Sequence, residues 1–376
     1  MPDTYQSPVD PDGLMEFSVV FTDRSLNSMS QSFQQVMRDI SGMLKDVYKA
    51  DHVAVVPGGG SYAMEAVARQ FGAGAHALIV RNGWFSFRWT QIFDAGQFTA
   101  KTTVIKARQS GNDTRAPFAP APIEDVVAAI REAKPDVVFA PHVETSAGIM
   151  LPDDYIAAMT AAAHEVGALM VLDCVASGCI WVDMAATGVD VLISAPQKGW
   201  SSTPSAGLVM MSARAKARIE QTTSNSFVMD LKKWLSIMET YEGGGHAYHA
   251  TMPTDGLRAF RDTMVETQAV GFDGLKEKQG ALGAAVRKLL SDRGIKSVAA
   301  PGFEAPSVVV SYTDDAAMQN GSKFAAAGMQ IAAGVPLQVD EPDDFRTFRI
   351  GLFGLDKLAD VDGTVARFKG VLDQVV

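Results

Sequence analysis

The chain has 376 residues, of which 43 are acidic and 33 basic, so its formal net charge is −10. This length fits two domains, and 47% hydrophobic with 20% charged residues is typical of a globular rather than a disordered protein. The acidic balance argues against nucleic acid or a membrane surface as the main partner. No apolar run is long enough to span a bilayer, and because the start is acidic and broken by proline, we expect no signal peptide there. Because Cys174 and Cys179 make no disulfide framework, we expect a cytoplasmic location.

Short Val- and Ile-rich runs alternate with alanine-rich helical segments between about residues 50 and 215. The predicted strands are His52–Val56, Ala77–Val80, Thr102–Lys106, Val137–Pro141, Leu169–Cys174 and Val189–Ala195. The predicted helices are Tyr62–Phe71, Ile123–Glu132 and Asp154–Val166. Alternation of this kind predicts an α/β fold in which a mostly parallel sheet is covered by helices on both faces.

The pattern changes after about residue 215, and the rest of the chain predicts a smaller α+β unit with its own core. Glycines 243 to 245 and Met252-Pro253 mark an irregular stretch, and a long helical segment follows it through Leu290. Pro306–Tyr312 and Phe345–Ile350 are predicted strands, and Leu355–Val376 is a predicted closing helix. We therefore predict a large domain at 1–255 and a small one at 256–376. We expect segment 1–25 to pack on the small domain or on a partner subunit.

A glycine-rich segment, Pro57-Gly-Gly-Gly-Ser61, follows a predicted strand and opens a helix. Glycines let the backbone approach an anion, and a helix N-terminus offers unpaired N–H groups with positive dipole. Two alternatives stay open: a structural turn with Ser61 as the N-cap, and a loose dinucleotide fingerprint, Gly58-x-Gly60-x-x-Ala63. Because Arg81-Asn82 stands where an NAD site would place an acid, the second alternative would mean an NADP-dependent oxidoreductase.

Metal chemistry finds little support in the sequence. His142-Val-Glu144 matches the first half of a zinc deaminase signature, but the Pro-Cys-x-x-Cys half is missing. There is also no His-Glu-x-x-His segment. We therefore predict no metal site, and we interpret both cysteines as ordinary buried side chains.

The strongest constellation is Asp173 with Lys198. Asp173 ends an apolar strand, and Lys198 lies just past the next one, so both fall at the carboxyl edge of a parallel sheet, where ligands bind. The segment Pro57–Ser61 arrives at the same edge. A desolvated lysine is a Schiff-base nucleophile, a buried Asp can hold a protonated pyridine nitrogen, and a helix N-terminus can hold a phosphate. These needs describe pyridoxal 5′-phosphate, while the plainer interpretation is a buried Asp–Lys ion pair.

At these residues the chain resembles the class V aminotransferases, which are fold type I pyridoxal-phosphate enzymes, near their alanine–glyoxylate and serine–glyoxylate (serine–pyruvate) branch. The resemblance runs from about residue 30 to the C-terminus. Seven segments carry it, in this order: Gly58–Ala66, Arg81–Phe85, Glu144–Gly148, Leu172–Ser177, Ser194–Gly199, Tyr248–Pro253 and Phe348–Gly351.

The resemblance implies roles for single residues. Lys198 would form the Schiff base, and Asp173 would pair with the ring nitrogen. Other implied cofactor contacts are Val175 and Phe85 on the two ring faces, Thr145 at the 3-hydroxyl, and Gly59, Gly60, Ser61 and Gln197 at the phosphate. Tyr248 and Thr251 would reach the phosphate of the neighbouring subunit, which implies a homodimer with shared sites. Arg349 would bind the substrate α-carboxylate, and its plainer interpretation is an exposed strand arginine.

One departure concerns the substrate side of the pocket. The family's early Gly-Pro-Gly loop is absent, and the chain reads Asp12-Gly-Leu-Met-Glu-Phe through Ser25 instead. Arg24 in this segment either reads a second carboxylate or forms a surface ion pair. The predicted function is transfer of an amino group from a small, alanine- or serine-like amino acid to a 2-oxo acid such as glyoxylate or pyruvate. The alternatives are a lyase of the same fold, such as a cysteine desulfurase, and the NADP-dependent oxidoreductase.

Overall fold

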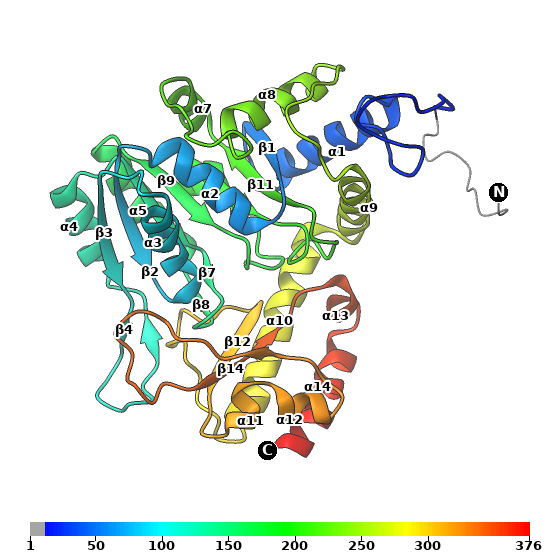
Figure 1. Cartoon of the computed structure of the whole chain (residues 1–376). Coiled ribbons are helices and arrows are strands. Elements are labelled where there is room, and N and C mark those ends of the chain that lie inside the picture. The colour runs from blue at the N-terminus through cyan, green and yellow to red at the C-terminus, as the bar shows by residue number, and fades with distance from the viewer. Residues whose placement is uncertain (1–11) are drawn as a thin grey trace.

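The computed structural model describes residues 12–376, which fold into a larger unit with a central sheet and a smaller unit beside it (Figure 1). The strands of the large sheet are β1 (His52–Pro57), β2 (His76–Arg81), β3 (Lys101–Lys106), β6 (Val137–Pro141), β9 (Leu169–Asp173), β10 (Val191–Ser194) and β11 (Ala206–Met211). Two short strand pairs are β4 (Arg108–Gln109) with β5 (Phe118–Ala119) and β7 (Val143–Glu144) with β8 (Ile149–Met150). The strands of the small unit are β12 (Val308–Tyr312), β13 (Ala332–Ala333) and β14 (Thr347–Gly351).

The helices follow the same division. Those of the larger unit are α1 (Gln31–Tyr48), α2 (Gly60–Phe71), α3 (Trp84–Gly96), α4 (Ile123–Ala133), α5 (Asp153–Glu165), α6 (Met184–Thr187), α7 (Ala213–Glu220), α8 (Leu231–Glu242) and α9 (Thr254–Val270). Those of the smaller unit are α10 (Phe272–Ser291), α11 (Ala316–Gln319), α12 (Ser322–Ala326), α13 (Leu355–Ala359) and α14 (Val361–Val375).

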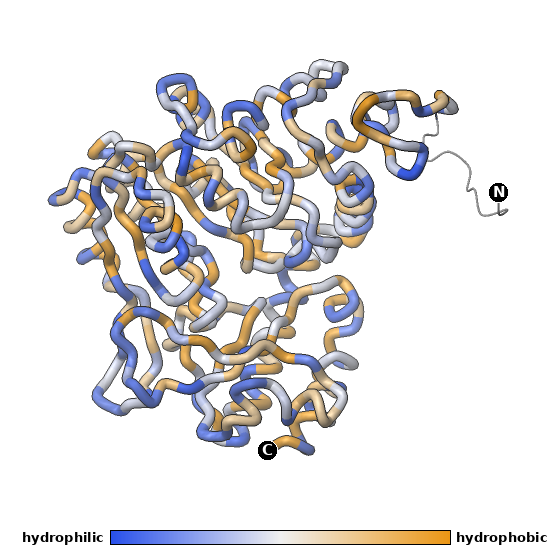
Figure 2. Tube along the Cα trace, viewed as in Figure 1, coloured by the Kyte–Doolittle hydropathy of each residue, from blue (hydrophilic) through white to orange (hydrophobic). Residues whose placement is uncertain are grey.

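The predicted mostly parallel sheet is confirmed. Its strand order is β1-β11-β10-β9-β6-β2-β3, and the five strands from β10 to β3 are parallel. Every residue of β6, β9 and β10 is buried, as strands covered on both faces require, and hydrophobic residues follow the strands in Figure 2. Strand β11, which the sequence analysis did not identify, runs antiparallel to both β1 and β10. Strands β1 and β10 therefore point the same way, and their carboxyl ends lie at one edge.

The small unit packs around an antiparallel sheet of order β12-β14-β13. Its core includes Phe324, Phe348 and Leu372. Two predicted helices are each divided in the structure. The long one breaks at Gly271, whose φ is 96°, and the closing one breaks at Asp360 between α13 and α14.

Helix α9 contributes to the core of the large sheet through Leu257, Phe260 and Met264, whereas α10 contributes Leu275 and Leu282 to the core of the small unit. The division of the chain at residue 255 stays a prediction. Residues 12–25 lie beside the start of α1, at the far end of the molecule from the small unit (Figure 1). Packing of this segment against a partner also stays a prediction, and residues 1–11 lie outside the described chain. Within residues 12–376, no helix is long and apolar enough to cross a membrane.

Candidate active site

The carboxyl edge of the sheet brings together loops from β1, β9 and β10 around a cavity of about 170 Å³. Its lining includes eight of the residues predicted from the sequence: Gly60, Ser61, Phe85, Thr145, Asp173, Val175, Gln197 and Lys198. Met64, Arg88, Val143 and Ala176 complete the lining and were not predicted. The expected convergence of a glycine-rich turn, a carboxylate and a lysine is therefore present in the structure.

The glycine-rich turn begins α2 without a side-chain cap. Gly59 is the N-cap residue of this helix, so the interpretation of Ser61 as the N-cap is wrong. Ser61 lies in the first turn, where its hydroxyl lines the cavity. A Cβ on Gly60 would lie 2.7 Å from Val175 Cγ2, so only glycine allows α2 to approach the loop after β9 this closely. The first N–H groups of a helix have no partner within the helix, so this helix start, whose Gly60 and Ser61 line the cavity, is suited to bind an anion.

Asp173 is the last residue of β9, and its side chain is buried with 8% exposure. Its Oδ1 accepts a hydrogen bond from the Val175 N–H at 2.9 Å. Burial raises the pKa of Asp173 to about 6, because desolvation disfavours the charged carboxylate more than the nearby Val175 N–H and cations favour it. Such a carboxylate is suited to accept a hydrogen bond from a protonated nitrogen, whose positive charge would stabilise the buried negative charge.

Lys198 follows β10, and burial is the main cause that lowers its pKa. The positive charges of Arg349 and Arg88 lower it further, while Asp173 opposes them. Its Nζ lies 5.0 Å from the centre of the Phe353 ring, and in the described chain it forms no ion pair. The interpretation of Asp173 and Lys198 as a structural ion pair is therefore wrong. A lysine with a lowered pKa has a larger neutral fraction, which is the form that attacks a carbonyl.

Phe85 stands in the first turn of α3, and a buried carboxylate that the sequence analysis did not assign to the site holds this turn. Glu144 is fully buried, and its Oε1 accepts from the backbone N–H of Phe85 and of Ser146, each at 3.1 Å. Its Oε2 accepts from the N–H and the hydroxyl of Ser86 at 2.9 and 2.6 Å. A Cβ on Gly83 would lie 2.7 Å from Glu144 Cγ, so the carboxylate fills the space that glycine leaves. Glu144 thus caps α3 and orients the aromatic wall of the cavity.

We expect Glu144→Gln to lower the free energy of unfolding by about 1–3 kcal/mol, because the amide nitrogen cannot accept hydrogen bonds and leaves buried donors such as the Ser86 N–H unpaired. Thermal unfolding of the cofactor-free protein measures this change. Glu165→Gln is the matched control, since it breaks an exposed ion pair with Arg131 and should leave the stability nearly unchanged. Equal effects of the two substitutions would contradict the capping role.

Four predicted residues lie outside the lining of this cavity. Gly59 is next to it as the N-cap of α2. Arg349 projects from β14 of the small unit, with its Nε donating to the Ala333 carbonyl at 2.7 Å and its guanidinium 5.5 Å from the Phe85 ring centre. Burial lowers its pKa, and Glu144 opposes that shift. Tyr248 is 59% exposed, and its hydroxyl contacts the Thr251 hydroxyl at 3.2 Å.

The structure offers little support for the two other functions considered, an NADP-dependent oxidoreductase and a lyase of the cysteine desulfurase type. Arg81 is buried and donates to Thr90 Oγ1 at 2.8 Å and to the Gln338 carbonyl at 3.2 Å, so its guanidinium already has partners. Both cysteines are buried, and burial raises the pKa of Cys174 and brings that of Cys179 to about 12. Such thiols are poor nucleophiles. Neither alternative is favoured by an observation of its own.

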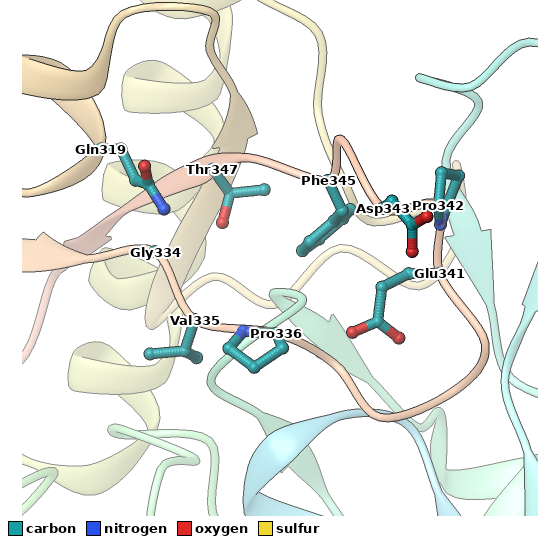
Figure 3. A pocket seen from close by; sticks show the side chains of 9 residues that line it. All are labelled: Gln319, Gly334, Val335, Pro336, Glu341, Pro342, Asp343, Phe345 and Thr347. Atoms are coloured by element: carbon teal, nitrogen blue, oxygen red, sulfur yellow. The ribbon is translucent and has the colours of Figure 1, made fainter.

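A second cavity, of about 270 Å³, lies in the small unit beside β14 (Figure 3). Its lining includes Glu341, whose carboxylate accepts from the N–H groups of Leu337, Gln338 and Val339 at 2.6, 3.0 and 2.9 Å. These bonds lower the pKa of Glu341 and hold the loop between β13 and β14. The Glu341 carboxylate therefore stabilises the loop, whereas the reactive side chains of Asp173 and Lys198 lie in the cavity at the sheet edge.

The residues at the sheet edge fit pyridoxal 5′-phosphate. Lys198 offers an amine to the aldehyde, and Asp173 offers a buried carboxylate to the ring nitrogen. Val175 and Phe85 are apolar walls for the ring, and the start of α2 is suited to the phosphate. The Oε1 atom of Gln197 is buried without a hydrogen-bond partner in the described chain, so this amide is left free for a ligand.

Comparisons with known proteins agree with this geometry. The rat (Rattus norvegicus) alanine–glyoxylate aminotransferase is 24% identical over 351 residues, which are 88% of this chain and 78% of the rat protein. The 2-aminoethylphosphonate–pyruvate transaminase of Burkholderia thailandensis is 29% identical over 339 residues, 86% of either chain. The crystal structure of an alanine–glyoxylate aminotransferase from Nostoc sp. superposes with a TM-score of 0.78 at 21% identity, covering 93% of this chain and 89% of that one.

The family profile "Aminotransferase class-V" matches residues 16–334, which is most of the chain. The predicted fold type I architecture and the pyridoxal 5′-phosphate dependence are thereby confirmed, since this family uses that cofactor. The chain belongs to the class V aminotransferase family and is a pyridoxal-phosphate-dependent transaminase.

Proposed function

We propose that this transaminase moves an amino group from a small, alanine- or serine-like amino acid to a 2-oxo acid such as glyoxylate or pyruvate. The observation that carries the proposal is the small cavity at the sheet edge, in which Lys198 and Asp173 lie with the start of α2, while Arg349 approaches from the small unit. Relatives named for glyoxylate and pyruvate support the choice of acceptor.

The bound cofactor supplies an aldehyde that takes the amino group and a protonated ring that takes up the electrons released at Cα. We assign the remaining tasks to this chain. Lys198 Nζ accepts the proton from the substrate Cα and delivers it to the aldehyde carbon of the cofactor, a role that its lowered pKa supports. The Asp173 carboxylate keeps the ring nitrogen protonated, and Phe85 and Val175 hold the ring between them. Thr145 binds the 3-hydroxyl, while Gly59, Gly60, Ser61 and Gln197 bind the phosphate.

We also propose a homodimer with shared sites in the cytoplasm. Tyr248 and Thr251 line no part of the cavity of their own chain, and Tyr248 is more than half exposed, so both are available to a neighbouring subunit. The cysteine-poor composition supports the cytoplasmic location. The mass of the protein in solution tests the dimer.

A panel of amino donors, scored by conversion of the bound cofactor, tests the proposed reaction. We expect alanine and serine to convert the cofactor fully and glyoxylate or pyruvate to restore it. Amines of the same size that lack a carboxylate should react poorly. Full conversion by such amines, with none by alanine or serine, would contradict the proposed substrate class.

We expect Arg349→Lys to raise KM for both the amino donor and the oxo acid, because the two half-reactions use one carboxylate site. A guanidinium binds a carboxylate with two parallel bonds, and losing one of them lowers kcat/KM about 10- to 150-fold. Cofactor affinity should not change, since the phosphate is held at α2. Arg346→Lys is the matched control: Arg346 lies just before the same strand and donates to the Asp314 carbonyl away from the cavity. Normal KM values in Arg349→Lys would mean that the carboxylate binds elsewhere.

A further inference from the structure

A second guanidinium lines the cavity at the end where α2 begins. Arg88 projects from α3, and its Nη1 donates to the Ser61 hydroxyl at 2.8 Å. Its Cζ lies 5.1 Å from the centre of the Phe85 ring. The side chain is therefore fixed at two points, by a hydroxyl in the first turn of α2 and by the aromatic wall, and both contacts are part of the cavity.

No carboxylate neutralises this guanidinium in residues 12–376, where its polar contact is the Ser61 hydroxyl. Arginines elsewhere in the chain differ in this respect: Arg69 pairs with Glu65, and Arg108 pairs with Asp125. The charge of Arg88 reaches into the cavity, because it lowers the pKa values of both Asp173 and Lys198. A partly buried cation without an acidic partner, aimed at a helix N-terminus, indicates that the anion comes from a ligand.

We propose that Arg88 is a cofactor-binding residue that neutralises the phosphate of pyridoxal 5′-phosphate together with Ser61 and the start of α2. The proposal rests on the proposed arrangement of the cofactor in this cavity. A phosphate monoester carries about −1.5 to −2 charges at neutral pH, and a helix N-terminus supplies only about +0.5. Within the lining, Lys198 and Arg88 are the two cations, and Lys198 is needed at the aldehyde. Arg88 is thus the lining cation that remains for the phosphate.

The contact with Ser61 selects the phosphate over a distal carboxylate of the substrate. Any anion held by the Ser61 hydroxyl lies within reach of the guanidinium that already donates to that hydroxyl. The substrate carboxylate is assigned to Arg349, which comes from the other unit of the molecule. A guanidinium can donate two parallel bonds to one phosphate, so Arg88 also fixes the orientation of the group.

The test compares cofactor binding with and without the phosphate group. Cofactor-free wild type, Arg88→Gln and Arg88→Lys are titrated with pyridoxal 5′-phosphate and with pyridoxal, and binding is followed by absorbance. We expect Arg88→Gln to weaken pyridoxal 5′-phosphate about 10- to 100-fold and to leave pyridoxal within about 2-fold. Arg88→Lys keeps the positive charge but cannot donate two parallel hydrogen bonds, so its affinity for pyridoxal 5′-phosphate should lie between those of wild type and Arg88→Gln. Arg69→Gln is the control, since Arg69 also stacks on a phenylalanine, Phe98, but lies outside the cavity.

The ionisation of the bound phosphate gives a second readout that a merely structural role would not change. A nearby cation favours the dianion, so the ³¹P signal of the bound cofactor should titrate below the ordinary pKa of about 6 in wild type. It should titrate at higher pH in Arg88→Gln. If Arg88→Gln does not fold, the smaller shift in Arg88→Lys serves the same purpose.

Three results would overturn the proposal. Equal weakening of both ligands would mean that Arg88 acts by holding Phe85, and unchanged affinity with an unchanged ³¹P titration would mean that it binds no phosphate. A raised KM confined to dicarboxylic substrates, with normal cofactor affinity, would place a substrate carboxylate at Arg88 instead. Failure of the proposed function itself looks different, because the wild-type protein would then bind pyridoxal 5′-phosphate normally but would not convert it with alanine or serine.

Discussion

Lys198→Ala should abolish turnover, with at least about a 10³-fold loss, while the protein stays folded. General base catalysis alone accounts for about 10²- to 10⁴-fold, and this lysine is also the amine that would hold the cofactor. Alanine removes a side chain that forms no ion pair within residues 12–376, so the fold loses little. Single-turnover conversion of the cofactor measures the loss, and circular dichroism with thermal unfolding checks the fold.

Chemical labelling identifies the lysine independently of activity. Borohydride reduction of the wild-type protein with bound cofactor, followed by peptide mapping, should place the label on Lys198. Lys276→Ala, which removes a lysine from α10 outside the cavity lining, should be labelled like wild type. A label on any other lysine would refute the assignment.

Asp173→Asn should keep the cofactor bound but lower kcat by orders of magnitude, because a neutral amide cannot keep the ring nitrogen protonated. The lost charge-assisted hydrogen bond weakens ground-state binding by about 1.5–3 kcal/mol, and the transition state loses more. A cofactor titration and a steady-state assay separate the two effects. Wild-type turnover in the variant would mean that Asp173 has only a structural role.

The same substitution, Asp173→Asn, should raise the stability of the cofactor-free protein at neutral pH, although it lowers activity. The pKa of Asp173 is about 6 in the folded state against an ordinary value of 3.8, so the folded state binds more protons between these pH values. Its stability therefore falls as pH rises from about 4 to 6 and stays lower above that range. A shift of about two pH units corresponds to about 3 kcal/mol. Asp173→Asn cannot ionise at this position, so its unfolding temperature should depend less on pH than that of the wild type. At pH 7, relative to acidic pH, the variant should therefore gain stability over the wild type.

Much of the large sheet could be predicted from the sequence because burial on both faces leaves continuous apolar runs, as in Val137–Pro141. The antiparallel direction of β11 could not, since its run of small and apolar residues, Ala206–Met211, has no feature that fixes its direction. Gly271 divides a helical pattern that looked continuous, because the residues on both sides of it keep helical spacing while facing different cores.

The site was predictable where one residue type answers one chemical need, as with Asp173 and Lys198. Glu144 and Arg88 were missed because their roles depend on contacts between distant parts of the chain, to Ser86 and to Ser61. For Glu144 a signal was present: an acid three residues past the apolar strand Val137–Pro141, followed by the hydroxyl residues Thr145 and Ser146. For Arg88 the sequence offers only an arginine among aromatic residues.

Strand β1 lies at one edge of the large sheet, where β11 is its only neighbouring strand among residues 12–376. During synthesis, the turn at Gly59 is made early, but the strand that leads to it has no pairing partner until Met211 has emerged from the ribosome. Asp173 and Lys198 are already translated by then, Asp173 at the end of β9 and Lys198 just after β10, and these two strands pair with each other. Long-range strand pairing is slow, because closing a large loop costs entropy before any contact forms. Cofactor capture therefore has to wait until β11 has paired with β1, and in a chain that ends before Ala206 the reactive lysine would be present while the strand that leads to the phosphate site has no partner.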